Sequence, residues 1–392
     1  MSAAPDPKHL LLLLEGTEGY GVMRVWETLA QGLPRRGWRL SATLLRDNPA
    51  LRTRWQALGI AVFVLPAPIP QPGGGALGKA RALMTRGAAQ LRLARQLSRE
   101  IRARGIGGLI LQSPLATLLA ARAARGSGTR AFWMMPNAVG SGYPLDLNRR
   151  VYRALFRHGP LIPVANSHFT DGTLGPGAFP RHVLHLGIDT QTFAPGAGAG
   201  QLRRADLGIP EDAPLFGLFA RMIRSKGHGV LVEALARVPD AHLLICGGPL
   251  DGAFGAELRT RVAEPDLAGR VHLPGPQSDV LPWLALCDVA VNSRLDPEPF
   301  GLSVIEGMAL GKPVLAHAAG GPSETVLDGE TGWLMEAPTA DAFAAGLHRA
   351  LADRARWQAM GMAARAHVEA HFSEEAMLDG LVAILEGKGA DS

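Results

Sequence analysis

The stretch VAVNSRLDPEPFGLSVIEGMALGKP, residues 289–313, contains a strand, a loop, a helix and the start of another strand. The segment 289–292 is short, apolar and rich in valine, as expected of a buried parallel strand. A loop rich in proline and glycine follows, and helical spacing begins near Leu302. The next apolar run starts at Pro313. This alternation predicts a parallel sheet with helices on its faces.

The same alternation continues on both sides of this stretch, through residues 202–372. Apolar runs predict strands at Leu215–Phe219, His242–Cys246, Val271–Leu273, Val289–Asn292 and Pro313–Ala316. Between them, helices are predicted at Gly229–Ala236, Gly255–Val262, Val280–Leu286 and Val304–Ala309, and residues 340–385 have helical composition. The second half is therefore predicted to form a doubly wound domain.

The first half repeats the pattern. Strands are predicted at Leu10–Leu14, Leu40–Leu45, Ala61–Leu65, Gly108–Gln112, Ala131–Met135 and Leu161–Ala165, with helices at Val22–Arg36 and Leu77–Arg104. A chain of 392 residues favours two domains. We predict an α/β protein of two doubly wound, Rossmann-like domains whose parallel sheets face each other across a cleft. The predicted divisions are an N-terminal domain 1–193, a linker 194–201, a C-terminal domain 202–372, and a helix and tail 373–392 that would cross back to the first domain.

The quoted loop is a candidate anion site. Peptide N–H groups at the start of the helix, in residues 301–304, would face a phosphate, and Gly301 would let it approach closely. Glu298 precedes the helix and Glu306 lies about two turns inside it, so the carboxylates would flank a ligand. Alternatively, Glu298 is a solvated loop residue and Glu306 an ordinary residue of a helix surface.

A second candidate lies where the strand at residues 215–219 ends in a basic loop. Arg221 and Lys226 stand in this loop, just before a predicted helix. An arginine fork and a lysine charge at a strand end can together bind a diphosphate. Taken alone, the segment is equally well explained as a solvated basic turn.

Together these motifs resemble retaining glycosyltransferases of family 4, which have the GT-B fold. The resemblance rests on Arg221 with Lys226-Gly227, and on Glu298 separated from Glu306 by seven residues. Further matching segments are Gly187-Ile188-Asp189, Cys246-Gly247-Gly248-Pro249, Gly320-Gly321-Pro322-Ser323-Glu324 and Gly329-Glu330-Thr331-Gly332-Trp333-Leu334. The resemblance is strong over residues 183–372 and general over the first half.

The resemblance implies a role for each matching residue. Arg221, Lys226 and Glu298 would be catalytic: the two cations bind the donor diphosphate, and Glu298 holds hydroxyls of the transferred sugar. Glu306 would accept hydrogen bonds from the ribose. The implied donor-binding set is Gly19, Gly21, Arg221, Lys226, Leu273, Pro274, Glu298, Phe300, Gly301, Leu302, Ser303, Val304 and Glu306. Leu273 and Pro274 would lie near the nucleobase.

The resemblance also implies the reaction chemistry and which domain binds which substrate. The anomeric configuration would be retained, and no metal or other cofactor would be needed, because cations and a helix terminus stabilise the departing diphosphate. The C-terminal domain would bind the nucleotide sugar, a UDP- or GDP-sugar. The N-terminal domain would face the acceptor, a saccharide or lipid-linked molecule of cell-envelope polysaccharide or lipopolysaccharide synthesis.

The N-terminal domain matches the family less closely. Its loop Glu15-Gly16-Thr17-Glu18-Gly19-Tyr20-Gly21-Val22 resembles the family's glycine-rich loop. The family commonly has a His after a central strand here, but no His occurs between His9 and His158. Asn137 is a candidate replacement, and Asn137 and Tyr143 are assigned to the acceptor side.

Charge is distributed unevenly. Residues 1–189 contain 24 Lys and Arg against 9 Asp and Glu, whereas residues 190–392 contain 16 against 26. The first half is therefore expected to face something anionic. One stretch contributes strongly: Lys79, Arg81, Arg86, Arg92, Arg95, Arg99, Arg102 and Arg104, interleaved with Leu83, Leu91, Leu97 and Ile101. It would lie on an anionic bilayer, or form a solvated helix that covers the sheet.

Other compositional features exclude several classes of protein. Cys246 and Cys287 have no spacing typical of zinc or redox pairs. Nucleic acid is a poor partner, because no nucleic-acid-binding signature accompanies the basic residues. We see no signal peptide and no apolar run long enough to span a bilayer. A cytoplasmic protein is expected, with peripheral attachment to the inner face of the membrane as an option.

Two other functions remain open. The glycines of the first loop, with Asp47 after the second strand, would suit an NAD(P)-dependent Rossmann oxidoreductase, although the glycines lack the full dinucleotide spacing. A catalytically silent nucleotide-sugar-binding protein of the same fold would lose the residues that grip the diphosphate. The presence of Arg221, Lys226, Glu298 and Glu306 favours an enzyme.

Overall fold

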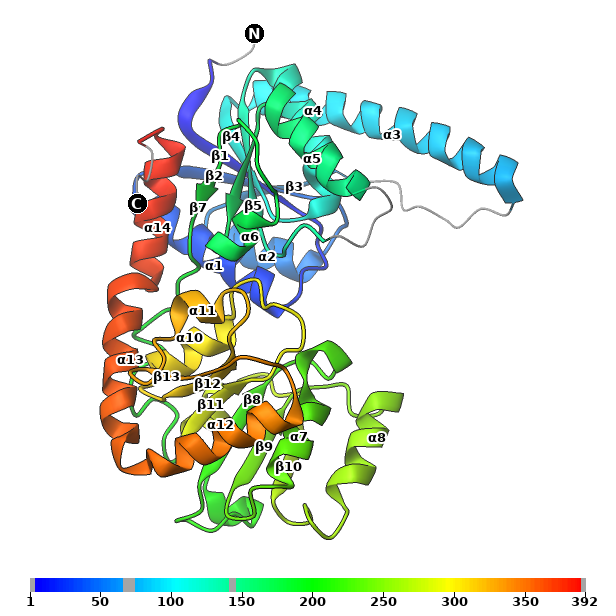
Figure 1. Ribbon diagram of the computed structural model, residues 1–392. Coiled ribbons are helices and arrows are strands. Elements are labelled where there is room, and N and C mark those ends of the chain that lie inside the picture. The colour runs from blue at the N-terminus through cyan, green and yellow to red at the C-terminus, as the bar shows by residue number, and fades with distance from the viewer. Residues whose placement is uncertain (1–3, 66–74, 141–145, 389–392) are drawn as a thin grey trace. The chain divides into compact units, whose positions relative to one another are not determined.

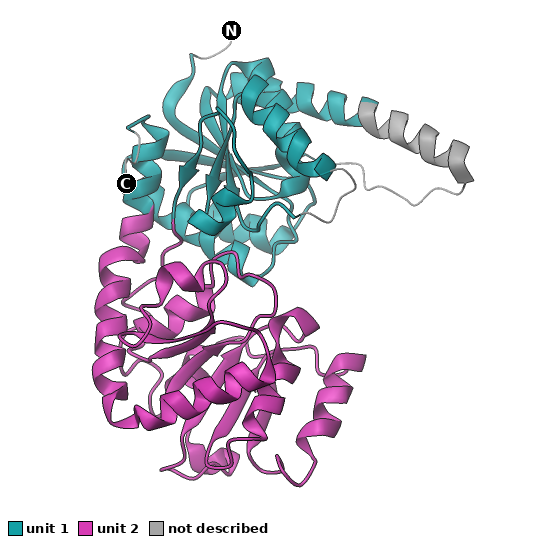
Figure 2. Ribbon diagram, in the orientation of Figure 1, with its two compact units in different colours: residues 1–184, 378–392 teal, residues 185–377 magenta. Residues whose placement is uncertain are grey.

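The computed structural model describes residues 4–65, 75–140 and 146–388, with only the backbone described for 75–87. The chain divides into two compact units (Figure 2): unit 1 comprises residues 1–184 and 378–392, and unit 2 comprises residues 185–377. Each unit is built on a sheet whose paired strands are all parallel.

Unit 1 contains a seven-stranded sheet in the order β3-β2-β1-β4-β5-β6-β7 (Figure 1). Its strands are β1 (Asp6–Leu14), β2 (Arg39–Leu44), β3 (Ala61–Val64), β4 (Ile106–Leu111), β5 (Arg130–Met135), β6 (Leu161–Ala165) and β7 (His182–Val183). The run Leu10–Leu14 forms most of the buried part of β1, an interior strand, as its apolar composition predicts. Leu11 and Leu13 point into one apolar core, where they join Leu109 and Leu111 of β4.

Helices cover this sheet. They are α1 (Tyr20–Arg35), α2 (Pro49–Ala57), α3 (Gly75–Ala103), α4 (Thr117–Ser127), α5 (Leu147–His158) and α6 (His168–Gly172). The last helix, α14 (Glu374–Leu385), begins in unit 2 and enters unit 1 at Leu378. There Leu378 packs so closely on α1 that a Cβ at Gly32 would overlap it, and Asp379 pairs with Arg36 at 2.8 Å.

Unit 2 contains a six-stranded sheet in the order β10-β9-β8-β11-β12-β13. Its strands are β8 (Leu215–Phe219), β9 (His242–Cys246), β10 (Val271–Gly275), β11 (Val289–Asn292), β12 (Val314–His317) and β13 (Gly332–Met335). Its helices are α7 (His228–Leu235), α8 (Ala253–Val262), α9 (Leu281–Leu286), α10 (Leu302–Ala309), α11 (Pro322–Thr325), α12 (Ala340–Ala352) and α13 (Trp357–His371). Val289 and Val291 point into one core cluster and Ala290 into another, so both faces of the sheet are covered.

The first unit ends before the predicted linker. Ile188 and Phe193 belong to an apolar cluster of unit 2, and the backbone of Ile188 pairs with Ser373. Residues 194–201 form a series of turns inside unit 2. The helix and tail assigned to 373–392 divide at Leu378 between the two units. Within the residues that the structure describes, no helix combines the length and apolar character that crossing a membrane requires.

Candidate functional site

The two predicted phosphate-binding segments lie at the ends of adjacent strands of unit 2. β8 and β11 are neighbours, with Phe216 opposite Val289. The chain runs from β8 outward to β10, and then returns to β11 and runs outward to β13 on the other side. Loops that follow strands at such a switch point are the usual ligand sites of doubly wound sheets. The sheet order thus brings the Arg221 loop and the Glu298 loop together.

Two hydrogen bonds to backbone carbonyls hold these two loops together. The Ser293 hydroxyl donates to the Lys226 carbonyl at 3.0 Å, and the Leu295 N–H donates to the Ser225 carbonyl at 2.9 Å. Gly227 has a φ of 75°, and a Cβ there would overlap the Ser293 carbonyl oxygen. Glycine is required at this position both for its left-handed backbone and for the close approach.

The Glu298 carboxylate lies at the centre of a charged cluster. Lys226 Nζ donates to Glu298 Oε2 at 2.7 Å, and Arg294 Nη1 donates to Oε1 at 2.7 Å. Asn292 Nδ2 lies 3.5 Å from Oε2. Glu298 is buried, with 8% of its surface exposed, so the solvated-loop alternative is wrong for this residue. Two of the predicted catalytic residues, Lys226 and Glu298, are therefore in direct contact.

A third loop holds the Glu298 backbone. The Glu298 N–H donates to the Ala319 carbonyl at 3.1 Å, and the Gly321 N–H donates to the Glu298 carbonyl at 2.8 Å. Gly320 has a φ of 81°, and a Cβ there would overlap the Glu298 carbonyl oxygen. The Gly-Gly pair thus permits the close contact that fixes the start of the 298–301 turn.

Helix α10 begins where the sequence predicts. Gly301 is its N-cap, with a φ of 100° that other residues rarely adopt. Leu302, Ser303 and Val304 form its first turn. The Val304 N–H donates to the Gly301 carbonyl at 2.9 Å, whereas the N–H groups of Leu302 and Ser303 lack intrahelical acceptors by geometry. Phe300 is buried beneath this turn. The helix start therefore has the predicted form of an anion site.

Glu306 lies on the buried side of α10, with 4% of its surface exposed. The interpretation of Glu306 as an ordinary surface residue is therefore wrong. The helix packs tightly on β11, since a Cβ at Gly307 would lie 2.5 Å from the Ala290 Cβ. A buried carboxylate needs polar partners to offset its loss of hydration.

The remaining donor-binding candidates of unit 2 are Arg221, Leu273 and Pro274. Arg221 is exposed in the loop after β8, and the next residue, Met222, donates its N–H to the Gly248 carbonyl at 2.9 Å. Leu273 and Pro274 belong to β10 itself, which is longer than predicted, and both are half-buried. Neither is in a described contact with the Glu298 cluster.

His228 is a residue that the sequence analysis did not single out. It starts α7, directly after the Lys226-Gly227 pair, and its side chain is fully buried. Among the described residues, neither ring nitrogen has a hydrogen-bond partner, although the peptide groups of Ala220 and Ile223 lie close enough to favour a protonated ring. Burial dominates and lowers the pKa of His228 to about 4. A histidine inside a strand-to-helix loop motif is the only signal that the sequence offered.

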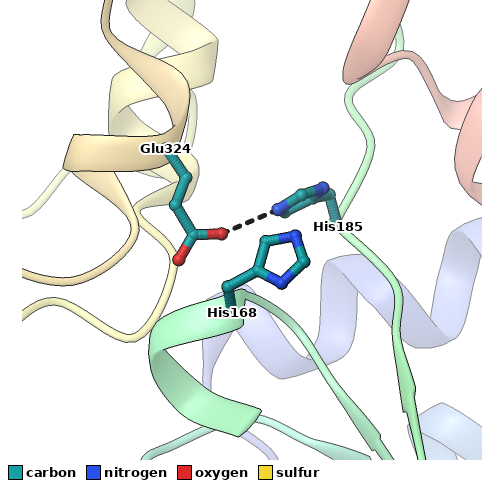
Figure 3. A group of neighbouring side chains, drawn as sticks. All are labelled: His168, His185 and Glu324. Carbon is teal, nitrogen blue, oxygen red and sulfur yellow. Dashed lines mark hydrogen bonds and ion pairs between the residues drawn. The ribbon is translucent and has the colours of Figure 1, made fainter. Parts of the chain in front are cut away.

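His185 and Glu324 form a further polar pair of unit 2. His185 Nε2 and Glu324 Oε2 are 2.9 Å apart, and Figure 3 shows the two side chains pointing toward each other. Glu324 stands on α11, within the Gly320–Glu324 motif. The separation of 139 residues along the chain hid this pair from the sequence analysis.

The candidates of unit 1 lie at the carboxyl ends of its strands. Gly19 is the N-cap of α1 and Gly21 lies in its first turn, after β1. Glu18 folds back so that its carboxylate accepts from the Gly16 N–H at 3.0 Å. Asn137 is exposed in the segment after β5. Tyr143 lies outside the described residues.

Comparisons with known proteins agree with the predicted family. Residues 201–367 match the family model described as glycosyl transferases group 1. The lipopolysaccharide core biosynthesis glycosyltransferase LpsE of Rhizobium meliloti is 32% identical over 185 residues, covering 47% of this chain and 53% of that protein. A GDP-mannose-dependent alpha-(1-6)-phosphatidylinositol monomannoside mannosyltransferase of Mycolicibacterium smegmatis is 35% identical over 203 residues, covering 49% and 52%. The chain thus spans about half the length of the curated relatives it matches.

The fold is shared over nearly the whole chain. The crystal structure of Alr3699/HepE of Anabaena, in complex with UDP, has a TM-score of 0.80 and 22% identity, and covers 97% of this chain and 99% of that one. This likeness confirms the prediction of two doubly wound sheets. Residues 201–367 are therefore similar to the glycosyl transferases group 1 family, and the fold of the chain is GT-B.

Proposed function

We propose that the protein is a glycosyltransferase that moves a sugar from a UDP- or GDP-sugar to a saccharide or lipid-linked acceptor. The observation that carries the proposal is the contact between Lys226 and Glu298 beside the start of α10. A cation for a phosphate and a carboxylate for a sugar hydroxyl stand side by side there. Relatives that act in lipopolysaccharide core synthesis or use GDP-mannose support a role in cell-envelope saccharide synthesis.

Different residues of unit 2 bind different parts of the donor. Arg221, Lys226 and the first turn of α10 bind the diphosphate and stabilise its charge as it leaves. Glu306 accepts hydrogen bonds from the ribose, and Glu298 accepts them from the transferred sugar. Leu273 and Pro274 lie near the base.

We further propose that transfer retains the anomeric configuration and needs no metal ion. The leaving phosphate assists removal of the acceptor proton on the face from which it departs, so the new bond forms on that face. Arg221, Lys226 and the helix terminus supply the positive charge that a divalent cation supplies elsewhere. Loss of transfer in EDTA that magnesium restores, or an inverted product by NMR, would contradict these two points.

α3 does not expose all of the residues that the sequence analysis assigned to a bilayer surface. Leu97 and Ile101 are buried in the core of unit 1, so they are not available to a bilayer. The side chains of Lys79, Arg81, Leu83 and Arg86 lie outside the described part. The exposed face of α3 presents Arg92, Arg95, Arg99 and Arg102, together with Leu91, which is 44% exposed. We propose that this face attracts an anionic surface through its positive charge.

The test of the function is donor binding and transfer by the purified full chain. UDP, GDP, UDP-glucose, GDP-mannose and NAD(P) are screened by thermal shift, since a ligand of the folded state raises the melting temperature. We expect one nucleoside diphosphate to stabilise the protein. Arg221→Ala with Lys226→Ala should lower transfer from the corresponding nucleotide sugar at least about 100-fold.

The matched control removes two exposed arginines of the same unit. Arg224 and Arg237 pair with Glu257 and Asp341 on the surface, so Arg224→Ala with Arg237→Ala changes the net charge equally. This control should keep near wild-type transfer. Unchanged transfer in the Arg221 and Lys226 double variant would overturn the assigned site, and stabilisation by NAD(P) alone would favour the oxidoreductase instead.

A further inference from the structure

The Glu298 carboxylate has a cation on each of its oxygens. Lys226 bonds Oε2 and Arg294 bonds Oε1, both at 2.7 Å. Lys226 comes from the loop after β8, whereas Arg294 comes from the same loop as Glu298, four residues earlier. One carboxylate is thus shared by a residue assigned to the diphosphate and by an arginine with no assigned role.

The two cations are held differently. Arg294 is fixed by Asp296, to which it donates from Nε at 2.9 Å and from Nη2 at 2.8 Å. The ion pairs with Asp296 and Glu298 outweigh burial and raise the pKa of Arg294. Its backbone is fixed too, because His317 Nδ1 donates to the Arg294 carbonyl at 3.0 Å. A planar guanidinium with two carboxylate partners is a rigid support for Glu298.

Lys226 has the opposite character. Its ammonium lies at the end of a flexible four-carbon stem and makes a point contact rather than a fork. It can rotate away from Glu298 toward a phosphate without a change in the backbone. The Glu298 oxygen that it leaves would then accept a hydrogen bond from a sugar hydroxyl.

We propose that Arg294 is a positioning residue that keeps the Glu298 carboxylate oriented and paired, so that Lys226 is released to the donor diphosphate. The inference rests on the proposed function. Without Arg294, Lys226 becomes the main counterion of a buried carboxylate, and a buried charge holds its last partner strongly. The Lys226–Glu298 pair then competes with the diphosphate for the ammonium.

The test is a double-mutant cycle on binding of UDP and GDP to the full chain, by calorimetry. Arg294→Ala should weaken binding about tenfold or more, because Lys226 is held by Glu298. Glu298→Gln should bind at least as tightly as wild type, because Lys226 is free of the carboxylate. In the Glu298→Gln background, Arg294→Ala should change affinity by no more than about twofold.

Controls separate this coupling from a loss of charge or of folding. Arg224→Ala removes an exposed arginine that pairs with Glu257, and it should leave affinity near wild type. Asp296→Asn loosens the support of Arg294 without removing a cation, and it should weaken binding in the same direction by a smaller factor. The melting temperature of each variant reports folding.

Each outcome is decisive. An equal effect of Arg294→Ala in both backgrounds would mean that Arg294 acts on the diphosphate directly, and no effect in either would mean that it does not act at all. Both results overturn the inference while leaving the proposed function intact. If wild type binds neither nucleotide, the proposed function fails, and the inference fails with it.

Discussion

At the scale of the residue, we predict that Glu306 recognises the ribose hydroxyls of the nucleotide. Its carboxylate is buried on α10, and we assign it to the ribose hydroxyls. Glu306→Gln keeps the shape and removes the charge, so the nucleoside diphosphate should bind about tenfold less tightly. The variant should also discriminate less between UDP and 2′-deoxy-UDP, or between the guanosine counterparts if GDP is the ligand.

Discrimination between the two sugars is the informative readout, since a general loss of folding would weaken both ligands alike. Calorimetric titration of wild type and variant with each nucleotide gives the comparison. If both proteins prefer the ribose form by the same factor, Glu306 does not contact the ribose.

His228 makes a prediction about acid stability. Its pKa is lowered to about 4 in the folded protein from an ordinary value of 6.5, mainly by burial. The unfolded chain therefore binds the proton more tightly, and protonation favours unfolding. Above pH 6.5 the ring is neutral in both the folded and the unfolded protein and does not alter the free energy of unfolding. That free energy falls as the pH drops from 6.5 toward 4.

At about pH 4.5 this linkage amounts to about 2 to 3 kcal/mol of the free energy of unfolding. The His228→Gln variant has no titrating group at this position. Its free energy of unfolding should therefore fall less than that of wild type between about pH 7 and pH 4.5. Urea unfolding of both proteins at both pH values isolates the histidine from the other titrating groups. Parallel losses in the two proteins would contradict the buried, neutral state of His228.

At the scale of the element, the close approach of two loops makes Gly320 irreplaceable. A Cβ there would overlap the Glu298 carbonyl oxygen, and the φ of 81° is unfavourable for other residues. Gly320→Ala should destabilise the protein by at least about 2 kcal/mol and weaken nucleotide binding, because the Glu298 turn must move.

Gly269 supplies the matched control. It has a φ of 77°, and no atom lies within 4 Å of the point that an added Cβ would occupy, so Gly269→Ala carries the backbone penalty alone, about 1 kcal/mol. Chemical unfolding and nucleotide titration compare the two variants. Equal destabilisation with equal affinity would mean that the contact between Gly320 and Glu298 is unimportant.

The exposed residues of helices α3 and α5 lead to a prediction about binding to anionic membranes. α3 exposes Arg92, Arg95 and Arg99, and α5 exposes Leu147 and Val151, at 59% and 45%. Vesicles that contain phosphatidylglycerol should sediment the protein, whereas neutral phosphatidylcholine vesicles should not, and high salt should release it. Replacing the three arginines by glutamine should lower binding by about 1 kcal/mol per residue.

A control triple variant of unit 2, at the exposed Arg203, Arg237 and Arg354, tests whether total charge alone matters. This variant should bind anionic vesicles as wild type does. Equal losses in the two triple variants would assign the attraction to net charge and not to α3, and no binding by wild type would remove the membrane from the proposal.

At the scale of the whole molecule, repeating apolar runs predicted the sheets because buried parallel strands need continuous apolar sequence. Two strands were not predicted. β7 has only two residues, which form no recognisable pattern, and Gly332–Met335, which forms β13, was interpreted only as part of a family motif. The sequence motifs predict Lys226 and Glu298 as site residues. Their mutual contact, and the support from Arg294, depend on how two loops pack, which spacing along the chain does not report.

The division of the chain into units was predicted less well for the same reason. Phe193 was assigned to the first domain and lies in the core of unit 2. Composition marked the flexible stretch that follows, whereas the core is defined by contacts between distant segments. Tertiary packing thus decides the boundary.

The return of α14 to unit 1 has a consequence for synthesis on the ribosome. Residues 1–184 leave the exit tunnel first, yet α1 lacks the cover of Leu378 and the pairing of Arg36 with Asp379 until unit 2 has been translated. Unit 2 is continuous in sequence and can be completed as it emerges. The unit that is translated first is therefore the one whose packing is finished last, and its nascent form exposes apolar surface throughout translation of the other.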